Sequence, residues 1–323
     1  MEEITQLPCK ESADTSLYYE YSLLISGFLA SFYILSVFSY FFIRFVFVYI
    51  VCRFCNPLRN ERGRWAIVTG GNSGIGRSYA FELAKNGINL IIVARTEQTL
   101  RTTAEEIRKT YGVECRYIPV DLGNDIAFQR VAEEARGKDI SVVINNAGII
   151  GNVPCLFLSE TDKNLLSMIN LHVKAVVNLS QLMLPSMLSK KRGIVVTISS
   201  FSSIYPVPCF SHYSSCKAFS DRFTRAISFE YENEGLRIQS LIPNLVSTRV
   251  INFVRCKYLI PTGDAFVSDA VRTIGASRHT TGYWAHEIQR YITEYLPKSL
   301  WKYLMLKFAR KTRNFFRMSV NVS

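Results

Sequence analysis

Short apolar runs alternate with helical patterns through the middle of this chain of 323 residues. The runs are rich in β-branched residues and occupy positions 65–70, 88–95, 115–121, 140–146, 193–200 and 236–243. Strands that are apolar throughout are buried on both faces, which indicates a parallel sheet with helices on either side. Because crossovers between parallel strands are right-handed, the pattern predicts an α/β fold, a doubly wound parallel sheet of the Rossmann type, over residues 64–250.

The segments between the runs have helical periodicity. Helices are expected after the first run as far as Lys85, and near 97–110, 125–136, 162–190 and 212–234. We find no internal repeat, so repeat arrays are excluded. The eight cysteines are scattered, Cys52 and Cys55 have no partner pair at zinc spacing, and the four histidines are isolated. We therefore expect no bound metal.

A glycine-rich turn, Thr69-Gly70-Gly71-Asn72-Ser73-Gly74-Ile75-Gly76, connects the first expected strand to the first expected helix. The backbone of such a turn can approach a pyrophosphate closely, and the N-terminus of the helix faces its negative charge. The glycine spacing G-x-x-x-G-x-G differs from G-x-G-x-x-G, and a glycine turn can also be purely structural. Its place between a strand and a helix favours a dinucleotide site.

Tyr213 and Lys217 are four residues apart in an expected helix, so their side chains project from one face. A phenol has a pKa of about 10, which makes it a poor acid–base catalyst at neutral pH. A neighbouring ammonium favours the phenolate, so we expect Lys217 to lower the pKa of Tyr213. Taken alone, the pair is more often a surface tyrosine and a solvated lysine.

Four motifs stand in order along the chain: T-G-x-x-x-G-I-G at 69–76, Asn145-Asn146-Ala147-Gly148, Ser200, and Tyr213-x-x-x-Lys217. With these motifs at these spacings the chain resembles the short-chain dehydrogenase/reductase family over residues 64–250. The segments QSLIP (239–243) and TTGYWAHEIQ (280–289) resemble a narrower branch of that family. The branch contains membrane-bound 17-beta-hydroxysteroid dehydrogenases, very-long-chain 3-oxoacyl-CoA reductases of the endoplasmic reticulum, and an inactive hydroxysteroid dehydrogenase-like relative.

The resemblance implies a role for each matching residue. Tyr213 would give a proton to a substrate carbonyl oxygen, and Ser200 would donate a hydrogen bond to the same oxygen. Lys217 would act on Tyr213, and Asn170, inside the long helix 162–190, would support a water-linked proton relay to Lys217. The implied cofactor contacts are Gly70, Asn72, Ser73, Gly74, Ile75, Gly76, Arg95, Asp121, Asn146, Ala147, Gly148, Tyr213, Lys217 and Thr248. The Pro-Gly that the family commonly has after its sixth strand is Pro243-Asn244 here.

The end of the second expected strand bears on the choice of cofactor. NAD enzymes usually place Asp or Glu there, whereas a ribose 2′-phosphate requires a cation such as Arg. This chain has Arg95 at that point and no acid before Glu97. NADP(H) is therefore the expected cofactor, and Arg77 either contributes to its binding or is a solvated helix charge.

No charged residue occurs from Tyr21 to Ile43, a stretch that as a helix would cover roughly 35 Å and cross a bilayer core of about 30 Å. A buried core helix is the alternative. The charged residues within 1–20 are mostly acidic, whereas those of the linker 44–63 are mostly basic. By the positive-inside rule, the N-terminus is expected in the lumen and the rest of the chain in the cytosol.

The formal net charge is +12, and part of it lies at the C-terminus. Residues 301–318 combine cations and aromatic residues without any acid. Such a helix is typical of a membrane surface or of the mouth of a site for an acidic substrate such as an acyl-CoA; packing on the fold is the plainer alternative. With a membrane segment present, we expect no nucleic-acid partner. Residues 251–300 are expected to shape the substrate pocket.

These observations lead to a hypothesis with one competitor. The chain is expected to be a membrane-anchored, NADP(H)-dependent oxidoreductase of the endoplasmic reticulum that acts on a lipid-like small molecule, either a 3-oxoacyl-CoA or a 17-beta-hydroxysteroid or ketosteroid. The helices 162–190 and 212–234 resemble those that form dimers in relatives, which implies a homodimer. The competitor is a catalytically silent, NADP-binding membrane scaffold or sensor.

Overall fold

The computed structural model describes residues 11–151, 154–247 and 258–320. The chain divides into two compact units, residues 1–47 and 48–323. Each unit is described by itself below.

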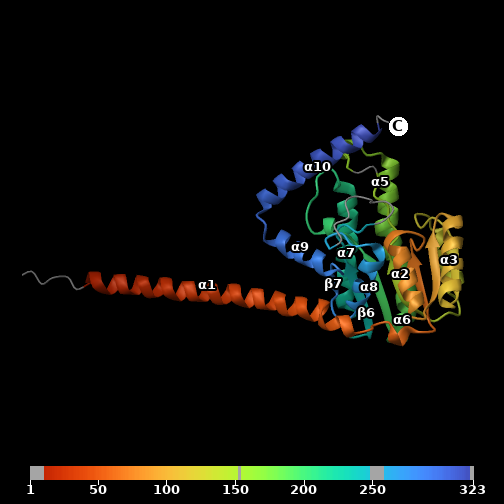
Figure 1. The fold of residues 1–323 in the computed structure, drawn as a ribbon, viewed down its shortest axis with the longest axis horizontal. Helices are drawn as coiled ribbons and strands as arrows, with labels where there is room; N and C mark the ends of the chain where they lie inside the picture. Colours follow the sequence, from red (N-terminus) through yellow and green to blue (C-terminus); the bar gives the residue numbers. More distant parts are fainter. Residues whose placement is uncertain (1–10, 152–153, 248–257, 321–323) are drawn as a thin grey trace, which may run out of the picture. The chain divides into compact units, whose positions relative to one another are not determined.

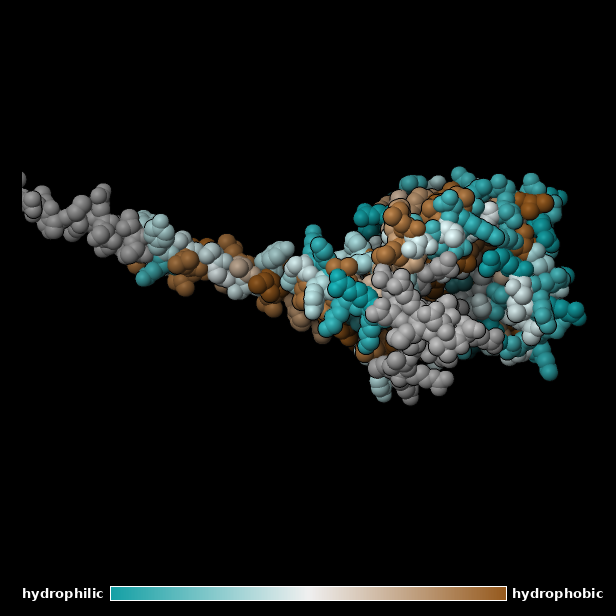
Figure 2. All heavy atoms as spheres, turned by 90° about the horizontal axis from the view of Figure 1, so that it is seen from above, coloured by the Kyte–Doolittle hydropathy of each residue, from teal (hydrophilic) through white to brown (hydrophobic). Residues whose placement is uncertain are grey.

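The first unit is made by most of helix α1, Glu11–Tyr49 (Figure 1). Its side chains are strongly exposed, with Leu23 at 69% and Phe28 at 70%, and hydrophobic residues run along it in Figure 2. The helical segment Leu17–Phe54 is long and apolar enough to cross a membrane. The helix continues past Ile43, so the start of the expected linker 44–63 is helical. The reason is that Arg44 is followed by a second apolar stretch, which prolongs the helix.

The second unit is built on a seven-stranded sheet in which all neighbouring strands are parallel. Its strands are β1 (Trp65–Thr69), β2 (Asn89–Ala94), β3 (Cys115–Pro119), β4 (Ile140–Asn145), β5 (Gly193–Ile198), β6 (Leu236–Leu241) and β7 (His279–Thr280). The strand order is β3-β2-β1-β4-β5-β6-β7. The expected doubly wound fold is thus confirmed. The two-residue β7 was not expected, because it is too short to give a periodic signal.

Helices cover both faces of this sheet. The covering helices are α2 (Gly74–Lys85), α3 (Glu97–Tyr111), α4 (Ile126–Ala135), α6 (Ala175–Ser189), α7 (Ser211–Glu230) and α8 (Gly263–Arg272). Buried side chains of α2, α3 and α8 form one core with the sheet, and those of α4, α6 and α7 form another on the opposite face. The remaining helices are α5 (Asp162–Ile169), α9 (Trp284–Tyr295) and α10 (Lys298–Val320).

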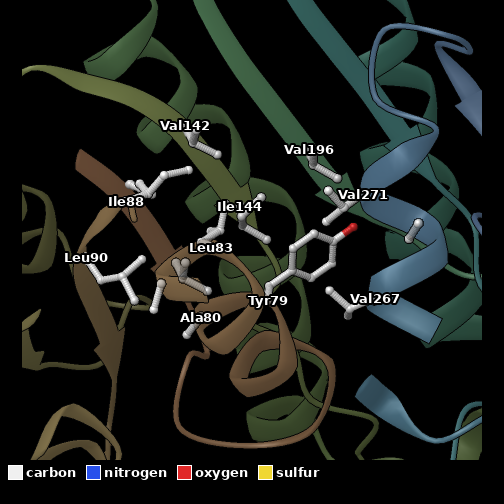
Figure 3. Close-up of a cluster of buried hydrophobic side chains, with 14 of the residues drawn as sticks. Tyr79, Ala80, Leu83, Ile88, Leu90, Val142, Ile144, Val196, Val267 and Val271 are labelled. Atoms are coloured by element: carbon white, nitrogen blue, oxygen red, sulfur yellow. The ribbon is translucent and has the colours of Figure 1, made fainter. Parts of the chain in front are cut away.

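Tyr79 lies at the centre of the first core. Its ring points from α2 toward Val196, Val267 and Val271 (Figure 3), and its side chain is fully buried. Among the described residues, its hydroxyl oxygen has no hydrogen-bond partner. A buried polar group without a partner costs free energy that its apolar replacement does not.

We therefore expect Tyr79→Phe to raise the melting temperature, with a gain in the free energy of unfolding of about 1 kcal/mol. Thermal unfolding of the purified protein in detergent measures the change. Tyr79→Leu is the matched control, because it empties space in the same core and should lower the melting temperature. A clear loss of stability in Tyr79→Phe would show that the hydroxyl has a polar partner.

The strand order indicates at which edge of the sheet the candidate site lies. The chain winds outward in both directions from the neighbours β1 and β4, so the loops that leave their carboxyl ends diverge and open a crevice. The glycine turn follows β1, Asn146 follows β4, and Ser200 follows β5. All three therefore meet at one edge.

Candidate active site

The glycine turn after β1 is closed too tightly for side chains. Gly70 has a φ of +66° and Gly74 a φ of +53°, a backbone conformation that favours glycine. A Cβ on Gly70 would lie 2.7 Å from Asn146 Nδ2, and one on Gly76 would lie 2.3 Å from the Gly70 carbonyl oxygen. Only backbone atoms of the turn therefore line the N-terminus of α2. Such a surface of backbone N–H groups is what a pyrophosphate requires for binding.

Hydrogen bonds tie this turn to the segment after β4. The Thr69 hydroxyl accepts from the backbone N–H groups of Asn146 (2.9 Å) and Ala147 (3.0 Å) and donates to the Ile144 carbonyl (3.1 Å). Asn146 Nδ2 donates to the Thr69 carbonyl oxygen at 2.9 Å. The side chain of Asn146 thus holds the glycine turn in place.

The other expected cofactor residues lie around this edge. Ser73 precedes α2 in an extended conformation and forms no side-chain cap, and Ile75 packs against the core. Asn72 Nδ2 donates to the Thr99 hydroxyl at 2.8 Å. Asp121 accepts from the Gly123 N–H at 2.9 Å. Thr248 lies outside the described residues.

Two arginines were candidates for a ribose 2′-phosphate. Arg95 follows the last residue of β2 and is exposed. Arg77 pairs with Glu106 and stacks on the Phe81 ring, with its guanidinium carbon 4.2 Å from the ring centroid. Since Arg77 has partners in the fold, Arg95 is the better placed of the two.

The structure brings Ser200, Tyr213 and Lys217 together at the end of β5. The Tyr213 hydroxyl is hydrogen-bonded to the Ser200 side chain, and Ser200 Oγ also accepts from the Ser202 hydroxyl at 3.0 Å. Lys217 Nζ lies 5.9 Å from the centroid of the Tyr213 ring and donates to the Ile198 carbonyl at 2.8 Å. One serine on a strand end and two residues one helical turn apart therefore form one cluster.

Burial decides the protonation states of this cluster, and here the expectation was wrong. Burial raises the pKa of Tyr213, and the hydrogen bond from Ser200 opposes this only in part. Burial lowers the pKa of Lys217 to about 8. The lysine ammonium donates to the Ile198 carbonyl, whereas burial is the larger influence on the phenol, so the pKa of Tyr213 lies above its ordinary value. The phenol is consequently neutral at physiological pH.

The expected long helix 162–190 is interrupted at Asn170. α5 ends at Ile169, a π-helical turn spans Asn170–Lys174, and α6 begins at Ala175. A π-turn widens the helix and shifts the register of its side chains, and such turns are frequent at functional sites. Asn170 is half-buried at this turn. Regular helical periodicity in the sequence cannot show such an interruption.

His172, in the same turn, is the residue of this site that sequence reasoning missed. It is 1% exposed, its Nε2 lies 2.7 Å from the Ile149 carbonyl oxygen, and its ring meets the Tyr213 ring edge to face at a centroid distance of 5.7 Å. A Cβ on Gly148 would lie 2.5 Å from His172 Cε1. The available signal was Gly148 itself, because glycine at that position leaves room for the ring.

Two buried neutral histidines predict a loss of stability in mild acid. Burial, together with the charge of Lys217, lowers the pKa of His172 to about 3, and burial lowers that of His286 to about 4. In the unfolded chain each histidine takes up a proton as the pH falls below the ordinary histidine pKa of about 6.5. In the folded chain the two histidines stay neutral down to about pH 4. The stabilisation is therefore complete above about pH 6.5 and is lost as the pH falls, by about 1.4 kcal/mol per pH unit for each histidine.

Melting temperatures between pH 7 and pH 5, taken as roughly the window above the titration of most carboxylates, measure this effect. His286→Gln, alone and combined with His172→Gln, should flatten the decrease. If both variants lose as much stability over this window as the parent protein, other groups control the acid sensitivity.

Among the described residues, no group of three or more His, Cys, Asp or Glu side chains is arranged to hold a metal ion. Asn244, which stands where the family has glycine, donates from Nδ2 to Gln289 Oε1 at 2.6 Å. This bond ties the loop after β6 to α9. The substitution thus adds a side-chain contact that glycine cannot make.

The family model described as short chain dehydrogenase matches residues 64–258. The chain belongs to this family. Among curated relatives, the human "Inactive hydroxysteroid dehydrogenase-like protein 1" is 38% identical over 76% of this chain and 76% of its own length. The mouse "Very-long-chain 3-oxoacyl-CoA reductase" is 34% identical over 78% of this chain and 81% of its own length. Both lie in the branch that the motifs indicated.

Solved structures support the fold of this family member. A 7beta-hydroxysteroid dehydrogenase structure has a TM-score of 0.70 at 22% identity and covers 77% of this chain and 98% of its own. A short-chain dehydrogenase from Sphingobium yanoikuyae in complex with NADPH has a TM-score of 0.59 at 26% identity and covers 64% of this chain and 82% of its own. The second unit, residues 48–323, which we call the catalytic unit, thus has the fold of these solved dehydrogenases.

Proposed function

We propose that the protein is a membrane-anchored oxidoreductase that transfers a hydride between NADP(H) and a carbonyl or hydroxyl group of a lipid substrate. The observation that carries the proposal is the hydrogen bond between the Tyr213 hydroxyl and the Ser200 side chain, with Lys217 beside them. This cluster lies at the same sheet edge as the glycine turn. A proton donor and a dinucleotide cradle at one edge are what carbonyl reduction requires.

The protonation states favour the reductive direction at neutral pH. Tyr213 is a neutral phenol because burial raises its pKa, so it can give its proton to a carbonyl oxygen. Ser200 lies within hydrogen-bond reach of that phenol and can donate to the same oxygen as negative charge develops. Bound NADPH supplies the hydride. Lys217, with a pKa of about 8, is mostly protonated at neutral pH and can return a proton toward the site through Asn170 and water.

The cofactor is NADP(H). The residues present suit it, because the glycine turn offers unhindered backbone and Arg95 stands exposed where β2 ends. Solved relatives of this family are described with NADPH or NADP bound, among them the Sphingobium yanoikuyae enzyme.

Arg95→Glu should weaken NADPH binding by about 10- to 100-fold, because it removes a charge-assisted contact with the 2′-phosphate and adds repulsion. Binding of NADH, which lacks this phosphate, should not weaken. NADPH and NADH fluorescence titrations measure both constants. Arg101→Glu, an equal change of charge on the exposed side of α3, is the control and should alter neither. Equal weakening of both cofactors in Arg95→Glu would remove Arg95 from the phosphate site.

Two substrate classes fit this proposal, a 3-oxoacyl-CoA and a ketosteroid. The curated relatives carry names of both kinds, and the cations of the C-terminal helix favour the phosphates of an acyl-CoA. Following NADPH absorbance with the purified full chain and long-chain 3-oxoacyl-CoAs or 17-ketosteroids distinguishes them. Turnover of neither class, with tight NADPH binding, would reject the lipid reductase.

A second candidate function is a silent NADP-binding scaffold or sensor on the membrane. The name of the human relative, an inactive protein, favours it. The presence of Ser200, Tyr213 and Lys217 together at the end of β5 argues against it, since we expect an inactive relative to have its tyrosine replaced. The substrate panel above separates the two candidates.

We place the protein in the endoplasmic reticulum membrane with the catalytic unit in the cytosol, and we propose a homodimer. The charge difference between 1–20 and 44–63 supports the orientation. Exposed Phe219 (40%) and Phe229 (59%) on α7 support a second copy at that helix. Protease protection in microsomes tests the orientation, and cross-linking of the full chain with Phe219→Ser as the variant tests the dimer.

A further inference from the structure

One side of α9 carries a line of exposed apolar side chains. Trp284 is 37% exposed, Ile288 40% and Ile292 61%. They are spaced four residues apart, so they lie along one face of the helix. Ala285 and His286, on another face, are almost fully buried. α9 therefore packs on the rest of the unit with a face of small and polar residues and leaves an apolar face exposed.

α10 repeats this arrangement. Ala309 is 2% exposed and Trp301 half-buried, whereas Leu300 is 42%, Tyr303 61% and Leu304 38% exposed. Leu300 and Leu304 are one turn apart, so they lie on one face of α10. Figure 1 shows the two helices as a V-shaped pair, and Figure 2 shows hydrophobic residues among hydrophilic ones on this unit.

The charge on α10 has one sign. Lys298, Lys302, Lys307, Arg310 and Lys311 are all exposed. No acidic residue occurs from Lys298 to the end of the helix, and Arg313 and Arg317 follow in the sequence. Exposed apolar side chains combined with cations are the pattern of helices that lie in the interface of a bilayer, where the cations meet lipid phosphates and the apolar groups enter the acyl boundary.

We propose that α9 and α10 form a membrane-surface site of the catalytic unit that binds a bilayer containing anionic lipids. Charge complementarity selects this occupant, since a second copy of this chain would bring an equally basic helix against the first. The proposal does not depend on hydride transfer or on the substrate class. It adds a second, peripheral membrane contact to the one that α1 makes possible.

This surface borders the candidate active site. Trp301 Nε1 donates to the Pro206 carbonyl at 3.2 Å, and its ring lies 5.3 Å from the Tyr205 ring. Tyr205 and Pro206 belong to the loop that joins Ser200 to Tyr213. α10 thus contacts the loop between Ser200 and α7 through Trp301, so binding of its exposed side to a bilayer would hold this loop near the lipid.

Hydrogen exchange of the full chain in nanodiscs tests the proposal, because α1 is then inserted under all conditions. Backbone amides of 298–311 should exchange about tenfold more slowly in discs of phosphatidylcholine with phosphatidylserine than in phosphatidylcholine alone. Amides of α3 are the internal control. Two variants should return the exchange of these amides to the rate in neutral discs. One is the double variant Leu300→Ser/Leu304→Ser, and the other is the triple variant Lys302→Gln/Lys307→Gln/Lys311→Gln.

Matched control variants are Ile126→Ser, which is 60% exposed on α4, and Lys85→Gln/Lys109→Gln, both exposed; these should leave the lipid effect unchanged. Equal exchange of 298–311 in both kinds of disc would overturn the proposal. Protection that rises with protein concentration and not with phosphatidylserine would also overturn it, in favour of a second copy. A lipid effect that survives the triple lysine variant would reject the role of charge.

Discussion

Replacing Tyr213 by phenylalanine should reduce turnover by about 10²–10⁴-fold, the contribution of a positioned general acid. The substitution removes only the hydroxyl that is bonded to Ser200 and leaves the edge-to-face contact of the ring with His172. NADPH affinity should therefore stay nearly unchanged. Steady-state NADPH consumption and a fluorescence titration of NADPH measure the two quantities separately.

Tyr231→Phe is the matched control for this prediction. Tyr231 follows the last residue of α7, the helix that begins near Tyr213, and its substitution should leave both quantities unchanged. If Tyr213→Phe keeps more than a few per cent of the rate, another group donates the proton. If it loses NADPH binding in parallel with turnover, the effect is on the fold of the site.

A methyl group at position 76 should weaken NADPH binding by about 100-fold, the equivalent of about 2.8 kcal/mol. The Cβ of Gly76→Ala would lie 2.3 Å from the Gly70 carbonyl oxygen and equally close to Asn146 Nδ2. Neither neighbour can yield easily, because one is backbone and the other is hydrogen-bonded to Thr69. The turn must therefore open, which displaces the backbone that would face the pyrophosphate.

Gly112→Ala separates this effect from a general loss of stability. Gly112 has a φ of +68° at the end of α3, and a Cβ there would meet nothing within 4 Å. We expect a stability loss of about 1 kcal/mol from the strained conformation and no change in NADPH affinity. NADPH affinity within twofold of the parent protein in Gly76→Ala would contradict the assignment of the turn to the cofactor.

The α/β architecture followed from local patterns alone. Apolar, β-branched runs separated by helical periods indicate a covered parallel sheet, and the expected strands near Ile67, Ile91 and Val143 are adjacent in the structure. Local patterns also located the glycine turn, because the chemistry of a turn is written in consecutive residues.

Non-local contacts decided what the patterns could not. The pKa of Tyr213 depends on how deeply its hydroxyl is buried and on its hydrogen bond with Ser200, and Lys217 Nζ is held by the Ile198 carbonyl on β5. The π-turn at Asn170 is stabilised from outside the helix, where the Ser220 hydroxyl on α7 donates to the His172 carbonyl at 2.6 Å. Such partners are distant in sequence, so no window of neighbouring residues contains them.

The amino-acid sequence by itself determined the parallel sheet, the glycine turn, the apolar N-terminal helix and the chemical types gathered at the site. These depend on hydrophobic periodicity and on glycine, which act over a few residues. Only the tertiary structure decided that Tyr213 is a neutral phenol, that His172 packs against it, and that α9 and α10 leave apolar side chains exposed. Burial and hydrogen-bond partners create these properties, and both arise only when distant segments pack together.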